Sequence, residues 1–523
     1  MLLSRSLFVL LAILLVPSPI VAQVTFSQVA ITGGEAPGVE GAEFGGFNPG
    51  IGPGGPAINA SGDVAFKTLL TGTGPDVRAI FGPTSGAGSP LGLLAQEGVP
   101  APGVEDGAEL SLFFNHLLLN ASGDVAFLAG LAGSFDMPAI FGPTSGAGSP
   151  LGPIVQAGNQ VPGIMDGSVF SFFGFPAFNA SGDIAFEAGF FSSGSAVFGP
   201  TAGAGSPLGP IAQQDEVAPG VDDGAVFGPL NESFDLSLNA SGDVAFGACL
   251  RTEPGFPREG ESAGTAIFGP TAGAGSPLGL IVRSGDPAPG VSDGAVFGVQ
   301  IPLLNDSGDV VISALLCTGT GNEVNNNNDT AIFGPTAGAG SPLGLIVREN
   351  TPAPGVDDGA TFDNLFSNSP SLNASGDIAF VARLRTGTSD IVDESNDAGL
   401  FTFVDGEFQL VVREGDLFTV TLPDGSSTED RTIASIVFSR DGMNDAGTLV
   451  FSLNFTNDTQ GIFIADFSVL LGDVNRDGVV NFLDIAPFVS VLSRREFQAE
   501  ADINEDGEVN FLDIAPFIFF LAS

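Results

Sequence analysis

One pentad, Asn-Ala-Ser-Gly-Asp, recurs along the chain at nearly regular intervals. Its five copies and two variants, NDSGD and NDAG, begin at Asn59, Asn120, Asn179, Asn239, Asn305, Asn373 and Asn444. Each copy is followed by an apolar run such as VAF. In most units AIFGPT, a GAGSPLG segment, an LIVR-like run and a Pro-Gly turn come next. Such repetition at a spacing of 59 to 71 residues indicates seven copies of one structural unit, stacked to share a core.

Each unit is predicted to hold four short strands. The Ser-Gly-Asp step favours a tight turn, because Asn, Gly and Asp tolerate positive φ and bond their own backbone. The run after it is apolar at consecutive positions, which is typical of a strand covered on both faces. The Pro-Gly step fits a type II turn into the next unit. Gly and Pro, 75 and 37 residues, are too dense for a helical pattern.

Seven four-stranded units predict an all-β fold, a seven-bladed β-propeller-like ring. Gln28–Val39 resembles the fourth strand of a unit with its turn, whereas the last unit stops after Gly461–Phe467, which resembles a third strand. We therefore expect the N-terminal strand to complete the last blade and close the ring. The alternative is a linear β-solenoid or paired sandwiches, because the repeat is longer than that of common propellers.

Residues 1–22 have the order of a secretory signal peptide: Arg5, an apolar run and small residues at a cleavage site. The alternative is a membrane anchor, but this run is too short to span a bilayer, so no membrane span is expected in the mature chain. We divide the chain into a signal peptide (1–22), a repeat domain (23–468) and a C-terminal module (469–523). A secreted protein, extracellular or on a bacterial cell surface, is expected.

The charge balance excludes some partners. Lys and Arg total 15 against 60 Asp and Glu, a net charge of −45, which repels nucleic acid and anionic membranes. Cys249 and Cys317 are the only cysteines, so disulfides do not hold the fold, and two buried free thiols are expected.

The loops between the second and third strands are long and polar in units four to six. Arginines gather in the same sector, at the ends of the second and fourth strands. They are Arg251, Arg283, Arg348, Arg383, Arg385 and Arg413. One hypothesis is a ligand-binding patch for a polar or anionic polymer such as an acidic polysaccharide. The alternative is that these arginines offset local carboxylates. The Asp residues of the turns could bind calcium between blades, but turn chemistry alone explains them.

Two twelve-residue loops near the C-terminus have calcium-binding spacing. Calcium prefers six to eight oxygen ligands, and the Gly at position 6 of each loop permits its sharp turn. The predicted ligands of two Ca²⁺ ions are Asp473, Asn475, Asp477, Val479, Asn481 and Asp484, and Asp502, Asn504, Asp506, Glu508, Asn510 and Asp513. Each loop leads into a helix with apolar residues at i, i+3, i+4 and i+7 from Ile485 and from Ile514. Pro487 and Pro516 fit only near a helix start.

This pair of loops, GDVNRDGVVNFLDIAPFVSVL and ADINEDGEVNFLDIAPFIFFL, resembles a type I dockerin domain. The resemblance implies one helix after each loop and docking to a cohesin. It also implies calcium ligation by Asp473, Asn475, Asp477, Asn481 and Asp484 and by their counterparts in the second loop. Where many dockerins carry a hydroxyl pair, this chain has Phe482-Leu483 and Phe511-Leu512. A cohesin-like partner and a cell-surface docking partner are therefore equal expectations. The repeat region is similar to the NxxGxxxF tandem repeats of large secreted bacterial proteins.

Two functions follow from these patterns. The first is a non-catalytic secreted binding or scaffold protein whose ring displays loops and whose calcium-ordered tail docks it. The second is a glycoside hydrolase or accessory subunit of a polysaccharide-degrading complex, active in polysaccharide catabolism. A glycosidase needs two carboxylates beside a sugar. Among 60 acidic residues some pair always meets this condition, so a pair alone is no evidence of a glycosidase. Trp and Tyr are absent and His116 is the only histidine, which favours the binding protein.

Overall fold

The structure is a computed structural model, and the chain forms two compact units. One is Thr25–Asp466 and the other contains Phe467–Ser523. The structure describes residues 24–522 apart from 48–53, 73, 105–106, 133–136, 192–193, 231–235, 253–261, 318–323, 326, 357–358, 366–369, 386–391, 405, 468–471, 473, 475–481, 495–500, 502 and 505–508. The predicted signal peptide lies outside the described residues.

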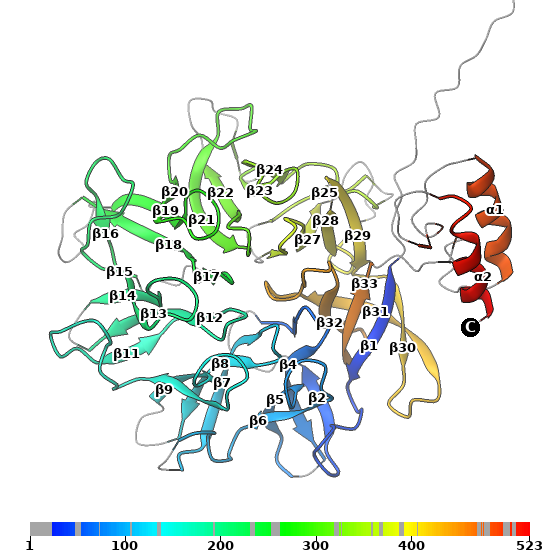
Figure 1. Cartoon of the computed structure of the whole chain (residues 1–523), viewed down its shortest axis with the longest axis horizontal. Coiled ribbons are helices and arrows are strands. Elements are labelled where there is room, and N and C mark those ends of the chain that lie inside the picture. Colours follow the sequence, from blue (N-terminus) through cyan, green and yellow to red (C-terminus); the bar gives the residue numbers. More distant parts are fainter. Residues whose placement is uncertain are drawn as a thin grey trace, which may run out of the picture. The chain divides into compact units, whose positions relative to one another are not determined.

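The first unit is a ring of seven antiparallel sheets, which confirms the predicted seven-bladed β-propeller (Figure 1). Blade 1 holds β2 (Glu43–Phe47), β3 (Ala57–Ile58), β4 (Val64–Thr71), β5 (Val77–Pro83) and β6 (Leu91–Gln96). Blade 2 holds β7 (Leu110–Leu119), β8 (Val125–Leu131), β9 (Met137–Pro143) and β10 (Leu151–Gln156). Blade 3 holds β11 (Phe170–Phe173), β12 (Ala177–Phe178), β13 (Ile184–Phe190), β14 (Ser195–Pro200) and β15 (Leu208–Gln213). Blade 4 holds β16 (Val226–Phe227), β17 (Leu236–Leu238), β18 (Val244–Arg251), β19 (Ser262–Pro270) and β20 (Leu278–Arg283).

The remaining blades repeat this order. Blade 5 holds β21 (Val296–Leu304), β22 (Val310–Cys317), β23 (Thr330–Pro335) and β24 (Leu343–Arg348). Blade 6 holds β25 (Thr361–Phe362), β26 (Ser371–Leu372), β27 (Ile378–Arg385), β28 (Ala398–Val404) and β29 (Glu407–Arg413). Blade 7 holds β30 (Leu417–Thr421), β31 (Thr428–Val437), β32 (Leu449–Phe455), β33 (Gln460–Asp466) and β1 (Thr25–Ile31). The predicted first strand is split into two pieces in blades 1, 3, 4 and 6, a division that the sequence pattern did not predict.

The N-terminal strand closes the ring, as predicted. Strand β1 pairs antiparallel with β33, with Thr25 opposite Asp466 and Ile31 opposite Gly461. It thus occupies the place that β6 has in blade 1, the fourth strand beside the third. A closed ring leaves no blade to fray at the two ends of the repeat region.

Blade 7 also carries a hairpin that folds over the closing strand. The Gln28 side chain donates to the Thr421 backbone oxygen (2.9 Å) and accepts from the Thr421 amide (3.0 Å). The rings of Phe26 and Phe418 meet edge to face, with centroids 5.1 Å apart. Strand β30 therefore holds β1 by contacts additional to its pairing with β33.

The second strand of each blade is buried along most of its length, which agrees with its unbroken apolar run. All seven residues of β8 are buried, for example. In blade 1, Phe66 lies opposite Phe81 in the register and stacks on it at 6.0 Å, and blade 2 repeats this with Phe127 and Phe141 at 5.3 Å. These phenylalanine pairs form the centre of the blades where they occur.

The pentads form the turns that were expected, and they also join neighbouring blades. The Asn59 side-chain oxygen accepts from the amides of Ser61 and Asp63, and its side-chain nitrogen donates to the backbone oxygen of Asn120 in blade 2 (3.1 Å). Gly123 shows why glycine is needed: its φ is +80°, and a Cβ there would lie 2.4 Å from the Ala87 amide nitrogen of blade 1. The recurring sequence therefore encodes contacts between blades as well as turns.

No disulfide joins Cys249 and Cys317. The expectation that both thiols are buried is wrong, because Cys249 is only partly buried and Cys317 is exposed. Both lie near the outer ends of their strands, in β18 and β22, where the long loops begin.

The described part of the second unit contains helices joined by turns. A short 3-10 turn η1 (Phe482–Asp484) leads into α1 (Ile485–Arg494), and α2 (Ile514–Ala522) follows the second loop. The two prolines lie in the first helical turns, as expected. Phe488 and Phe517, which are equivalent residues of the two halves, stack with centroids 4.1 Å apart. The buried stripe departs from the predicted spacing, because Val489 and Ile518 are 55% and 59% exposed.

Candidate functional site

The two predicted calcium loops lie only partly within the described residues. Four of the twelve predicted ligands are described, and they are Asp484, Asn504, Asn510 and Asp513. The other eight lie outside the described residues: Asp473, Asn475, Asp477, Val479, Asn481, Asp502, Asp506 and Glu508. No group of three or more His, Cys, Asp or Glu side chains that could hold a metal is found among the described residues.

The last ligand position of each loop is fully buried. Asp484 and Asp513 are both 0% exposed. The Asp513 carboxylate accepts from the amides of Asn510 (2.8 Å) and Asn504 (3.2 Å), which fixes it at the start of α2. The loop thus folds back on the carboxylate that ends it.

These residues fit calcium. A buried carboxylate is costly unless a positive charge or strong hydrogen bonds compensate it, and two amide donors leave part of its accepting capacity unused. Calcium is a hard cation that takes carboxylate and amide oxygens, which are the donor types at the predicted positions. A cation bound in the second loop would complete the compensation of Asp513.

Large apolar side chains lie exposed beside each loop. Phe482 and Leu483 are 76% and 67% exposed, and their counterparts Phe511 and Leu512 are 80% and 66% exposed. Neighbouring Ile485 is 41% exposed. Exposed aromatic and aliphatic groups in two matching copies are typical of a protein-binding surface.

The six arginines of the predicted ligand patch all have polar partners in the ring. The partners are Asp215 for Arg251 (2.5 Å), Asp223 for Arg283 (2.7 Å), Asp293 for Arg348 (2.6 Å), Asp397 for Arg383 (2.8 Å), Glu349 and Asp363 for Arg385, and the Asn396 backbone oxygen for Arg413 (2.9 Å). The hydrogen bond from Arg283 holds the pKa of Asp223 below its ordinary value. Such ion pairs agree with the alternative interpretation, in which the arginines offset local carboxylates. Ligand binding by the arginines stays a prediction.

Two carboxyl groups in the same sector have pKa values above the ordinary value of a glutamate. Burial, with a smaller contribution from Asp397, raises the pKa of Glu414 to about 7. Burial also raises the pKa of Glu349, although a hydrogen bond from Arg385 opposes the shift. Each follows the arginine that ends its fourth strand, so blades 5 and 6 repeat the arrangement.

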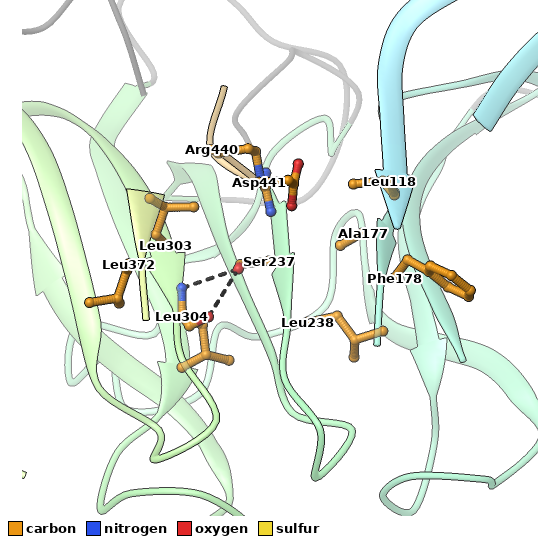
Figure 2. Close-up of a pocket in the computed structure, with 10 residues that line it drawn as sticks. All are labelled: Leu118, Ala177, Phe178, Ser237, Leu238, Leu303, Leu304, Leu372, Arg440 and Asp441. Atoms are coloured by element: carbon orange, nitrogen blue, oxygen red, sulfur yellow. Dashed lines mark hydrogen bonds between the residues drawn. The ribbon is translucent and has the colours of Figure 1, made fainter. Parts of the chain in front are cut away.

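A pocket of about 100 Å³ lies on the ring axis, between the innermost strands (Figure 2). Its lining is Leu118, Ala177, Phe178, Ser237, Leu238, Leu303, Leu304, Leu372, Arg440 and Asp441. Most of these side chains come from the positions just before the recurring asparagines. The carboxylate pair that a glycosidase needs is not among them.

The burial of Lys67 was not predicted from the sequence. Lys67, the only lysine of the chain, is 1% exposed, and its Nζ donates to the Phe114 backbone oxygen of blade 2 (2.8 Å). Burial lowers its pKa to about 7. Lys67 directly follows Phe66 within the apolar run of the second strand, and this position could have indicated its burial. His116 in β7 stacks on Phe175 of blade 3, at a centroid distance of 5.0 Å.

The comparisons with known proteins match both units. The family described as "Family of unknown function (DUF7453)" matches residues 22–470, and the type I dockerin domain matches residues 471–521. No curated protein matches the chain. None of the helices in the described part of the chain has the length and apolarity needed to cross a bilayer.

Three solved structures show weak similarity. The β-propeller domain of the Trilobed protease from Pyrococcus furiosus is 8% identical, with a TM-score of 0.39, over 79% of this chain and 94% of that one. A protein of unknown function from Dyadobacter fermentans is 11% identical, with a TM-score of 0.26, over 84% and 98%. A sialidase is 10% identical, with a TM-score of 0.21, over 85% and 48%. Because each TM-score is below 0.5, none of them assigns a function to this chain.

Proposed function

Because the chain belongs to the DUF7453 family, whose description assigns no function, and carries a type I dockerin domain after its ring, we propose that it is a non-catalytic, secreted binding protein. Its propeller displays loops for a polar or anionic ligand such as a polysaccharide. Its tail attaches it to an extracellular or cell-surface complex when two calcium ions order the loops.

The observation that carries the docking part is the doubling of one arrangement in the tail. Each half ends its loop in a fully buried aspartate, Asp484 or Asp513, and exposes a Phe-Leu pair next to it. Calcium binding would fix the loops, and the apolar pairs would then be presented in a defined geometry. Because the pairs are apolar, the proposed partner is a cohesin-like domain or a surface protein with a complementary apolar face.

The composition of the ring supports a binding role over catalysis. The lining of the axial pocket includes one carboxylate, Asp441, and no second one, whereas a glycosidase needs two. The second candidate is a glycan-active subunit of a polysaccharide-degrading complex. Glu414 favours it, because a carboxyl group with a pKa of about 7 could act as a general acid.

The test of docking uses the full chain, immobilised and exposed to envelope and secreted proteins of the producing cells, with calcium or with chelator. We expect a partner that is retained in calcium and released by chelator. The double variant Phe482→Ser with Phe511→Ser should lose that partner, whereas Phe191→Ser, which alters a ring residue 65% exposed, should keep it. Retention that ignores both calcium and the double variant contradicts the proposal.

The test of catalysis is a screen for new reducing ends on a panel of neutral and acidic polysaccharides. The binding role predicts retention on some member of the panel without bond cleavage. Cleavage that Glu414→Gln abolishes would replace the binding role with the second candidate.

A further inference from the structure

An open groove of about 370 Å³ lies between blades 1 and 2, which are neighbours in the ring (Figure 1). Its lining comes from the loop after β5, the turn before β8 and the loop after β9. The long polar loops of the ring begin at the opposite ends of the third strands. The groove therefore belongs to the other face of the ring, away from the arginine-rich sector.

Hydrogen bonds to main-chain amides hold the groove in shape. The Ala87 amide of blade 1 donates to the Ser122 backbone oxygen of blade 2 (2.8 Å), which joins the loop of one blade to the turn of the next. Within blade 2, the Gly148 amide donates to Asp124 Oδ2 (2.7 Å). A site that is fixed before a ligand arrives orders little of the chain on binding, which favours affinity.

The groove offers one charged acceptor and one hydroxyl donor. Asp124 Oδ2 accepts from Gly148 and from Asn120 Nδ2 (3.2 Å), whereas Oδ1 accepts no hydrogen bond among the described residues. Ser149 Oγ accepts from the Ser145 amide (2.9 Å), and a hydroxyl that accepts can still donate its own hydrogen. Both side chains belong to the lining.

The rest of the lining includes apolar side chains that solvent reaches. Leu94 and Leu151 are half-buried and Pro150 is exposed. Sites for small ligands combine such apolar walls with a few polar groups, in a volume of about 300–1,000 Å³. The groove lies at the lower end of this range. It suits a ligand with C–H groups on its faces and hydroxyl groups at its edge.

Charge narrows the class of ligand further. An anion would be repelled by Asp124 and by the net charge of −45. A calcium ion needs six to eight oxygen ligands, and no group of three or more metal-binding side chains is found in the part of the chain that the structure describes. A neutral ligand that donates hydrogen bonds meets neither obstacle.

The frame of the groove recurs along the ring. Asp183 accepts from the Gly205 amide (2.8 Å) and Asp243 from the Gly275 amide (2.7 Å), as Asp124 does from Gly148. The Ala147 amide of blade 2 likewise donates to the Ser181 backbone oxygen of blade 3 (3.0 Å). A recurring frame suits a ligand that is itself a polymer of one repeating unit.

We propose that the groove between blades 1 and 2 binds a pyranose ring of a neutral glycan. One sugar hydroxyl donates to Asp124 Oδ1, another accepts from Ser149, and the C–H face of the ring packs on Leu94 and Pro150. This inference rests on the proposed binding role of the ring, but it places the ligand on the face opposite to the arginines.

Hydrogen-exchange mass spectrometry of the full chain tests the site directly. The probes are cellohexaose, maltohexaose and mannohexaose, with hexagalacturonate as the anionic counterpart. We expect at least one neutral hexasaccharide to slow amide exchange in both loops of the groove, residues 84–90 and 144–151, and hexagalacturonate to leave it unchanged. Absence of protection by all three neutral probes, or equal protection by hexagalacturonate, overturns the proposal.

A matched pair of variants tests the carboxylate. Asp124→Asn keeps one oxygen for Gly148 and places an amide group where the sugar hydroxyl would donate, so the affinity for the protecting hexasaccharide should fall about tenfold. Asp63→Asn makes the same change in the pentad of blade 1, outside the lining, and should bind like the original chain. Unchanged affinity in Asp124→Asn overturns the assignment.

A second pair leaves these hydrogen bonds in place. Ser85 is exposed at the edge of the groove, and its side chain has no hydrogen bond among the described residues, so Ser85→Tyr should block the groove and abolish protection. Ser145→Tyr alters the identical loop of blade 2 outside the lining and should keep it. Retention on the polysaccharide panel without protection of the two loops would refute the groove alone, whereas no retention on any polysaccharide would refute the binding role as well.

Discussion

The side-chain nitrogen of Asn444 in blade 7 donates a hydrogen bond of 3.0 Å to the backbone oxygen of Asn59 in blade 1, 385 residues earlier. The same bond joins Asn59 to Asn120, Asn120 to Asn179, Asn179 to Asn239, and Asn305 to Asn373. Each donor is a buried asparagine that also caps its own turn. These asparagine bonds therefore join neighbouring blades at five of the seven junctions, and Asn444 makes the bond at the point where the ring closes.

Replacing Asn444 by alanine should destabilise the ring. The variant removes the bond to Asn59 and leaves the amides of Ala446 and Thr448 without their acceptor, at a cost of about 1–3 kcal/mol for buried polar groups. Asn457→Ala is the matched control, because Asn457 caps an exposed turn of the same blade. Urea unfolding of the full chain measures both, and a control variant that loses as much stability as Asn444→Ala would contradict the role of burial.

The hairpin over the closing strand predicts a second effect on stability. Gln28→Leu removes both hydrogen bonds to Thr421 but keeps the pairing of β1 with β33, so the free energy of unfolding should fall by about 1–3 kcal/mol. Ser27→Ala, at the exposed neighbouring position, should change little. Faster proteolytic cleavage near residue 24 in Gln28→Leu than in Ser27→Ala would show that the strand detaches first; equal rates would mean that the hairpin does not hold it.

The ring could be predicted because each blade contains one pentad or pentad variant. Its closure could be predicted because the N-terminal segment resembles the fourth strand that the last unit lacks. It could not show that Asn59 bonds to Asn120, since that contact exists only when two blades stand side by side. The β30–β31 hairpin was missed because Leu417–Thr421 matches no part of the repeat. Arginines such as Arg348 were visible, but their carboxylate partners lie up to 60 residues away in the chain, so the sequence left their pairing open.

The calcium site predicts a stoichiometry. The intact chain should bind two calcium ions by isothermal titration, and Asp484→Asn should bind one, because the last carboxylate of the first loop is lost while the second loop is intact. Asp424→Asn removes an acidic residue from an exposed turn of the ring and should leave two ions bound. If Asp484→Asn still binds two calcium ions, Asp484 is not a ligand and the prediction is wrong.

The raised pKa of Glu414 predicts a loss of stability on the alkaline side. Its pKa is about 7 in the folded chain against an ordinary value of 4.5, so the folded state binds more protons between these values. The stabilisation is complete below pH 4.5 and is lost as the pH rises through 7. Glu414→Gln cannot ionise, so its thermal midpoint should exceed that of the original chain at pH 8 by more than at pH 5. Glu407→Gln, at the exposed start of the same strand, should show no such difference.

Lys67 predicts the opposite dependence at higher pH. Burial lowers its pKa from 10.5 to about 7, so between these values the unfolded chain binds the extra proton. Stability should therefore rise from pH 7 toward 10.5, and the contribution is lost as the pH falls to 7. The window is nearly free of other titrations, because the chain has no tyrosine, no other lysine and two cysteines. Lys67→Leu introduces the residue that blade 2 has at the equivalent position, Leu128, and should abolish the rise. Thermal midpoints of both chains, measured from pH 7 to 10, test this prediction. If the midpoint of Lys67→Leu still rises with pH, another group titrates, because this variant has no amine at the site.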